Sequence, residues 1–124
     1  MTLRQKQSLF FKLIAEFLIW VHSHPGWETT LGEGFVYETR TAETTTAAGV
    51  IVKDRVHKKN SNHYVGLAQD INFFVDGKWI SDGGDPRWTE LGAKWESLNP
   101  LCRWGGRFRD VDSNHFSLEH QGRA

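Results

Sequence analysis

Two histidines and an aspartate, His63, Asp70 and His115, are the side chains of this sequence best suited to hold a catalytic metal ion. They supply three protein ligands and leave the fourth position of a tetrahedral zinc open, which distinguishes a catalytic zinc site from a closed structural one. Zinc lowers the pKa of a bound water to about 7, and Asp112 is near enough to His115 in sequence to handle the proton. These residues therefore predict a hydrolytic site for one Zn²⁺.

The spacing of the first two ligands sets a condition on the fold. His63 and Asp70 are seven residues apart, and on one continuous strand an odd separation would point them to opposite faces. Gly66 lies between them and allows the chain to turn, so that both can face one ion. His115 must then come from the tail, folded back beside the sheet. Residue types alone leave another interpretation open, in which a structural histidine is hydrogen-bonded beside an aspartate at a strand end.

Two helices are predicted from apolar residues at helical spacing. The first covers the apolar run at 9–21, with Thr2 and Gln5 as a capping box, and ends before Pro25-Gly26. The second begins at Pro86 with Asp85 as its cap and is stopped by Asn99-Pro100.

The strongest strand pattern lies at 67–75, followed by a hairpin turn at Asp76-Gly77 and a return strand at 78–80. A short strand is expected at 35–37 and a short helix at 41–48, stopped by Gly49. Residues 27–34 and 53–62 are expected to be loops, and the tail at 101–124 is mixed, with a turn at 104–106. Strands and unequal helices in this order predict an α+β fold with a small antiparallel sheet and flanking helices.

Length and composition narrow the class of protein. The 124 residues predict a single domain over 1–124, and fifteen basic residues balance fifteen acidic ones, which gives no reason to expect nucleic acid as a partner. Lys12 and Glu16 interrupt the N-terminal apolar run, so neither a signal peptide nor membrane insertion is expected. Cys102 is the single cysteine, which excludes an intramolecular disulfide and cysteine-pair zinc sites, and its apolar setting favours a buried, inert thiol.

Two segments resemble a known family of enzymes. Residues 61–70 match the pattern S-x-H-x-x-G-x-A-x-D, and residues 104–116 look like the closing motif W-G-G-x-F … D-x-x-H-F. These motifs resemble the zinc D-alanyl-D-alanine carboxypeptidase family, which includes phage L-alanyl-D-glutamate endolysins and shares its fold with the Hedgehog signalling domain. Arg40 and Glu43 are similar to a third, looser family segment, R-[ST]-x-E. The resemblance extends over about residues 8–118.

The resemblance implies roles for individual residues. His63, Asp70 and His115 would be the zinc ligands and Asp112 the catalytic acid and base. Arg40 would contact the substrate or the developing oxyanion, while Ser61 and Glu43 would support the first ligand or the substrate. The Asp-x-x-His form of the closing motif is similar to the endolysin branch of the family.

These implications predict a metallopeptidase that hydrolyses an amide in the stem peptide of bacterial peptidoglycan, at the L-Ala–D-Glu bond, as a phage endolysin does in cell lysis. We expect a monomer that stays in the host cytoplasm before lysis and then acts on the cell wall. One alternative is a D,D- or L,D-carboxypeptidase with the same metal centre. Another is a non-catalytic module that keeps the metal for stability or for binding a partner, against which the presence of both Asp112 and Arg40 argues.

Overall fold

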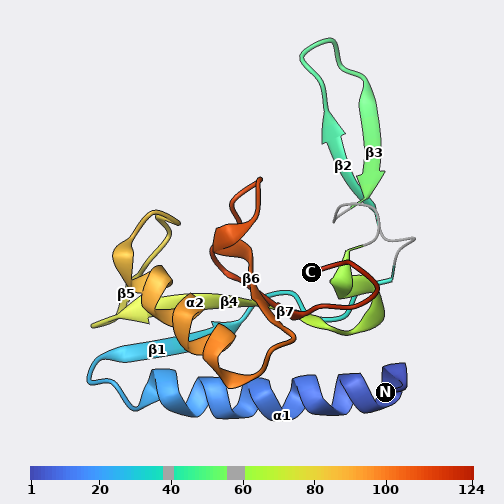
Figure 1. Ribbon diagram of the computed structural model, residues 1–124. Coiled ribbons are helices and arrows are strands. Elements are labelled where there is room, and N and C mark those ends of the chain that lie inside the picture. Colours follow the sequence, from blue (N-terminus) through green and yellow to red (C-terminus); the bar gives the residue numbers. More distant parts are fainter. Residues whose placement is uncertain (38–40, 56–60) are drawn as a thin grey trace.

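A computed structural model describes residues 1–37, 41–55 and 61–124 (Figure 1). The described residues form two α-helices, two short 3₁₀ helices and antiparallel strands, so the protein has an α+β fold, as predicted. None of the helices among the described residues is long and apolar enough to cross a membrane.

The first helix, α1 (Leu3–His22), forms because its sequence supplies both a start signal and a buried face. Thr2 accepts a hydrogen bond from the Gln5 backbone while the Gln5 side chain accepts one from the Thr2 backbone, so the predicted capping box is confirmed. The second helix, α2 (Pro86–Leu98), starts at the predicted proline, where Asp85 accepts a hydrogen bond from the Arg87 backbone.

The sheet is built around β4 (Ala68–Val75), the strand that was predicted most strongly from sequence. It pairs with β1 (Trp27–Leu31) on one side, and on the other with β7 (His115–Leu118) and then β5 (Lys78–Trp79). The last strand, β6 (Cys102–Trp104), lies outside β7. All these pairs are antiparallel, which confirms the predicted small antiparallel sheet.

The two helices pack against one face of this sheet and leave the other face for the candidate site. Phe17 of α1 contacts Phe116 of β7, and Trp88 of α2 contacts Phe73 of β4. Ile71 and Phe73 are fully buried in this core. Because side chains alternate along a strand, Asp70 and Asn72 point to the opposite face.

Several predicted elements were wrong. Residues 27–31 form strand β1 rather than a loop, and residues 35–37 form no strand. Residues 41–45 form β2 (Thr41–Thr45) rather than a helix, paired with β3 (Ile51–Arg55), because consecutive threonines are β-branched and suit a strand. Gly49, expected to stop a helix, turns this hairpin at a φ of 80°. The tail contains β6 and β7.

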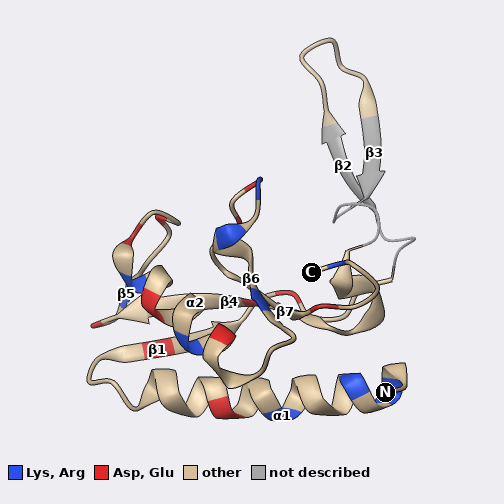
Figure 2. Ribbon diagram, in the orientation of Figure 1, with Lys and Arg blue, Asp and Glu red and all other residues tan. Residues whose placement is uncertain are grey.

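Charged residues of both signs are interspersed along the chain (Figure 2). On α1 the basic residues outnumber a single acidic one, whereas both signs occur on α2 and in the loop that follows β6, and the β2–β3 hairpin projects away from the sheet (Figures 1 and 2). The balance of charge in the whole sequence therefore does not hold on α1, which is basic.

Candidate metal centre

His63, Asp70 and His115 come together at one point on the open face of the sheet. The cluster offers one ligand atom from each residue, and these atoms lie within 4.8 Å of one another. The Asp70 Oδ1 atom is 3.2 Å from His63 Nε2 and 3.4 Å from His115 Nδ1. Three residues that are far apart in sequence therefore present one carboxylate and two imidazoles to a common point.

His63 is positioned by a short 3₁₀ helix, η1 (Asn62–Val65), which has a capped start and ends in a turn. The Ser61 hydroxyl accepts a hydrogen bond from the His63 backbone at 3.2 Å and so caps the helix. Gly66 ends it with a φ of 68°, a left-handed conformation that favours glycine. The chain therefore turns between His63 and Asp70 at the glycine that the sequence indicated.

The orientation of the His63 ring is fixed by the backbone of the segment after β1. His63 Nδ1 lies 2.7 Å from the Gly34 carbonyl oxygen, to which it donates, and this leaves Nε2 facing Asp70. A hydrogen bond from the second ring nitrogen is typical of metal-binding histidines, because it fixes the tautomer and the ring plane.

Asp70 and His115 are brought together by strand pairing. They face one another directly in the antiparallel register of β4 and β7. Directly paired residues on one face have side chains close enough to share a ligand. The register of two strands thus places two of the three candidate ligands side by side.

One buried polar atom at this point forms no hydrogen bond. Asp70 Oδ1 is buried, and among the described residues it approaches His63 Nε2 and His115 Nδ1 without forming a hydrogen bond to either. Such atoms are uncommon in folded proteins because a hydrogen bond normally offsets the cost of desolvation. A divalent cation would compensate the carboxylate oxygen, so the residues present fit a metal ion with N and O ligands.

The electrostatics of the cluster keep its carboxylate ionised. Burial acts to raise the pKa of Asp70, but the imidazoles of His115 and His63 outweigh it and lower this pKa to about 2. Burial acts to lower the pKa of His63, and the neighbouring Asp70 outweighs this effect and raises it. Asp70 is thus ionised at neutral pH, the form in which a carboxylate binds a cation.

Asp112 lies beside the cluster, with its side chain about half exposed. Its Oδ2 is 3.9 Å from His115 Nδ1, too far for a hydrogen bond, so it stands next to the three-residue cluster without belonging to it. Its backbone is fixed by hydrogen bonds from the Asp112 N–H to Gly105 and from the His115 N–H to Asp112. The loop therefore holds this carboxylate at the edge of the site.

The remaining predicted site residues are placed differently. Ser61 caps the helix that carries His63, as described above. Glu43 lies in β2, where it pairs in register with Lys53. Arg40 lies outside the described residues, so its predicted contact with the substrate stays a prediction.

Sequence reasoning missed several residues that hold the site together. Asn62 is fully buried and its Nδ2 donates to the Leu118 carbonyl at 2.6 Å, which ties η1 to the end of β7. Gln7 of α1 donates to the Val65 carbonyl at 2.8 Å and so connects the same helix to α1. The only local signal was that Asn62 directly precedes His63. These contacts join residues more than fifty positions apart, and no local sequence pattern predicts them.

A comparison with protein families matched the D-alanyl-D-alanine carboxypeptidase family over residues 55–118. The matched segment contains all three candidate ligands and Asp112, whereas Arg40 and Glu43 lie before it. A comparison with curated proteins gave no match.

The family match and the geometry agree on the chemistry. The match supports a hydrolase of the metallopeptidase type, whose members depend on zinc, and the His63, Asp70 and His115 cluster is able to bind such an ion. The matched segment spans 64 of the 124 residues, more than half of the chain. The protein therefore belongs to the D-alanyl-D-alanine carboxypeptidase family.

Proposed function

We propose that this protein is a zinc endopeptidase of the phage endolysin type that hydrolyses the L-Ala–D-Glu bond in the stem peptide of bacterial peptidoglycan. The observation that carries the proposal is the convergence of the ligand atoms of His63, Asp70 and His115 within 4.8 Å, with Asp112 beside them. A zinc ion held there would supply Lewis acidity and would lower the pKa of a bound water.

The chain's own residues divide the remaining work. His63 and His115 contribute neutral nitrogens and Asp70 a negative charge, so the ligand set neutralises only part of the charge of a divalent ion. Asp112 lies next to the cluster and is half exposed, so it can take a proton from the attacking water and return it to the leaving amine. Arg40 is proposed to stabilise the oxyanion that develops on the scissile carbonyl.

The supporting residues have a separate part in the proposal. Ser61 holds the His63 backbone through its hydroxyl and so positions the first ligand. Glu43 is proposed to act near the substrate from the β2–β3 hairpin. Arg40 and Glu43 lie before the segment that matches the family, so these two assignments rest on the looser sequence motif alone.

The alternative function is a D,D- or L,D-carboxypeptidase with the same metal centre, which the description of the matched family favours. The two activities differ in the substrate terminus, because a carboxypeptidase requires a free carboxylate held by a basic side chain and an endopeptidase accepts an internal bond. Digestion of purified peptidoglycan by the zinc-loaded protein, followed by mass spectrometry of the fragments, decides between them. We expect fragments with a new amino-terminal D-Glu, whereas release of a single terminal amino acid would establish the carboxypeptidase.

The proposal also includes where the protein acts. We propose that it works as a monomer on the cell wall and is held in the host cytoplasm until lysis. A single species of about 14 kDa in analytical ultracentrifugation is the expected result for a monomer.

A further inference from the structure

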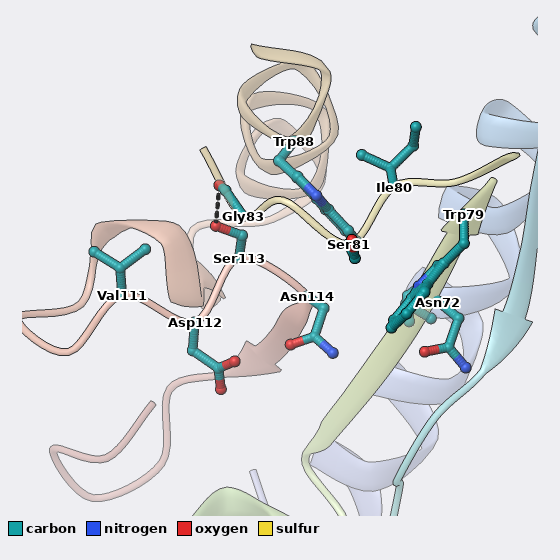
Figure 3. A pocket seen from close by; sticks show the side chains of 11 residues that line it. Asn72, Trp79, Ile80, Ser81, Gly83, Trp88, Val111, Asp112, Ser113 and Asn114 are labelled. Atoms are coloured by element: carbon teal, nitrogen blue, oxygen red, sulfur yellow. Dashed lines mark hydrogen bonds between the residues drawn. The ribbon is translucent and has the colours of Figure 1, made fainter. Parts of the chain in front are cut away.

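A pocket of about 290 Å³ opens beside Asp112, on the side of the site that lies toward β5 (Figure 3). It arises from a gap in strand pairing, since β4 pairs with β7 only as far as Asp70 and with β5 only from Phe74 onward. The volume is near the low end of the range of about 300–1,000 Å³ typical of small-molecule sites, so it suits one ring-sized group.

The pocket begins one residue away from two of the candidate ligands. Ile71 and Asn114, which follow Asp70 and precede His115, both line it, and so does Asp112 itself. Asn72 lies two residues along β4 from Asp70 on the same face, a distance of about 7 Å along a strand. A group bound in the pocket would therefore be joined to a carbonyl at the metal centre by about one residue of substrate.

The lining combines an exposed aromatic ring with neutral polar groups. Trp79 is 61% exposed although it is a tryptophan, and Figure 3 shows it beside Asn72, with the polar ends of Asn114 and Asp112 across the opening. The ring of Trp88 forms part of the wall, and its Nε1 is buried with no hydrogen-bond partner in the described part of the chain. A flat exposed indole near carboxamide donors and acceptors suits the C–H faces, hydroxyls and acetamido group of a sugar.

Charge disfavours the residue on the other side of the scissile bond. Among the described residues that line the pocket, Asp112 is the one with an ionisable side chain, and it is acidic. D-Glu, which follows L-Ala in the stem, carries a free carboxylate that this lining would repel. The sugar on the opposite side of L-Ala is neutral and is attached to it directly through a lactyl group, which is the short connection that the geometry requires.

We propose that this pocket binds the N-acetylmuramyl sugar to which the stem peptide is attached, with Trp79 and Asn114 as specificity-determining residues. The inference rests on the proposed function, because it assumes cleavage of the first amide of the stem. In this proposal the enzyme prefers stem peptides that are still attached to the glycan, and peptides released from the glycan are poor substrates.

The test compares two substrates with the same scissile bond, N-acetylmuramyl-L-Ala-D-Glu and N-acetyl-L-Ala-D-Glu, with the zinc-loaded full chain. We expect kcat/KM to be at least about tenfold higher for the muramyl substrate, a difference of about 1.4 kcal/mol. Trp79→Ala should remove most of that preference, by lowering kcat/KM for the muramyl substrate toward the value for the acetyl peptide. Trp79→Phe should retain part of it, because it keeps an aromatic face.

Phe11→Ala is the matched control, since Phe11 is an exposed aromatic residue of α1 on the face opposite the site, and it should leave both substrates unchanged. Thermal unfolding of each variant verifies that it is folded. Equal cleavage of the two substrates by the parent, or an equal loss on both in Trp79→Ala, overturns the pocket assignment while the peptidase stands.

A binding measurement separates the two proposals. Isothermal titration with the product-like ligand N-acetylmuramyl-L-Ala should show binding that Trp79→Ala weakens about tenfold, whereas N-acetyl-L-Ala should bind equally to both proteins. If N-acetylmuramyl-L-Ala binds more weakly to Trp79→Ala but neither substrate is cleaved, the sugar pocket is supported and the peptidase is contradicted. If N-acetylmuramyl-L-Ala binds equally to the parent and to Trp79→Ala, or does not bind, the sugar pocket is overturned.

Discussion

Asp70 is the residue on which the candidate metal centre depends most. Its Oδ1 is the atom that both imidazoles approach, at 3.2 and 3.4 Å, and it is buried without a hydrogen-bond partner among the described residues. Asp112 has the same functional group but a different setting, because it is half exposed and stands 3.9 Å from His115. Two carboxylates on one site thus differ in burial and in distance, which assigns them to different roles.

Substitution of these two residues should separate metal binding from proton transfer. Asp70→Ala, like His63→Ala and His115→Ala, should lower the zinc content measured by atomic absorption and abolish hydrolysis, because it removes one of three ligands. Asp112→Ala should retain one zinc per chain and lose about 10²–10⁴ in kcat, the usual contribution of a general acid and base. Full zinc occupancy in Asp70→Ala would refute the ligand set, and a parent-like kcat in Asp112→Ala would remove that residue from the mechanism.

Cys102 has a thiol, which is a candidate nucleophile by its chemistry. Its buried position in the structure makes it inert. It is 2% exposed in the core, and burial raises the pKa of its thiol to about 12. The thiolate is the reactive form, so at any pH below about 10 the native protein should contain almost none of it. We expect no labelling by a thiol-specific disulfide reagent at pH 8 in buffer and one equivalent in denaturant. Stoichiometric labelling of the native protein within minutes would contradict this assignment.

At the scale of elements, the loop from β6 to β7 holds Asp112 and His115 because a glycine lets two backbone segments touch. A Cβ atom at Gly105 would lie 2.1 Å from the Asp112 carbonyl oxygen and 2.8 Å from the His115 Cβ. The loop is further held by Trp104, whose Nε1 donates to the Ser113 carbonyl at 2.7 Å. The tryptophan and first glycine of the W-G-G motif thus position the acid/base candidate and the third ligand.

Gly105→Ala should therefore weaken the site without touching a ligand. The added methyl group must displace the Asp112 backbone carbonyl and the His115 Cβ, so we expect lower zinc affinity and a loss of at least about tenfold in kcat/KM, since an overpacked site shifts its neighbours. Gly84→Ala is the control, because its Cβ would meet only the exposed Asp82 side chain, at 3.3 Å, and it should behave as the parent. Isothermal titration with zinc and steady-state kinetics measure the two effects. Parent-like affinity in Gly105→Ala would show that the loop adjusts freely.

The same scale shows what the sequence could predict. The elements with strong local signals, α1 with its capping box, α2 with Asp85 and Pro86, and β4 with its hairpin, were predicted correctly. β1 was missed because its residues are mostly exposed and show no apolar alternation, so that the strand depends on pairing with β4.

The candidate site divides in the same way. The three candidate ligands were named from a motif, and the fold brings their side chains together. The contacts that orient them were not, because the Gly34 carbonyl and the Asn62 side chain reach the site through the fold. The pocket beside Asp112 could not be predicted either, since it is created by where two strands stop pairing with β4.

At the scale of the whole molecule, the candidate ligands come from three segments that are far apart in the sequence. His63 comes from η1, Asp70 from the central strand and His115 from the strand beside it, so the cluster exists only when the sheet is complete. A cation that binds these residues together binds the folded state and not the unfolded chain, and its binding free energy therefore adds to the stability of the fold.

Zinc should consequently stabilise the whole protein. At free zinc about 100 times the Kd, the free energy of unfolding should rise by about 2.7 kcal/mol. For a chain of this size that corresponds to an increase in Tm of roughly 8 °C, reversed by a chelator. His63→Ala should show no such increase, because it lacks a ligand, whereas Asp112→Ala should keep it in full. A Tm that does not respond to zinc in the parent, or that rises equally in His63→Ala, would mean that the ion does not bind where the three side chains meet.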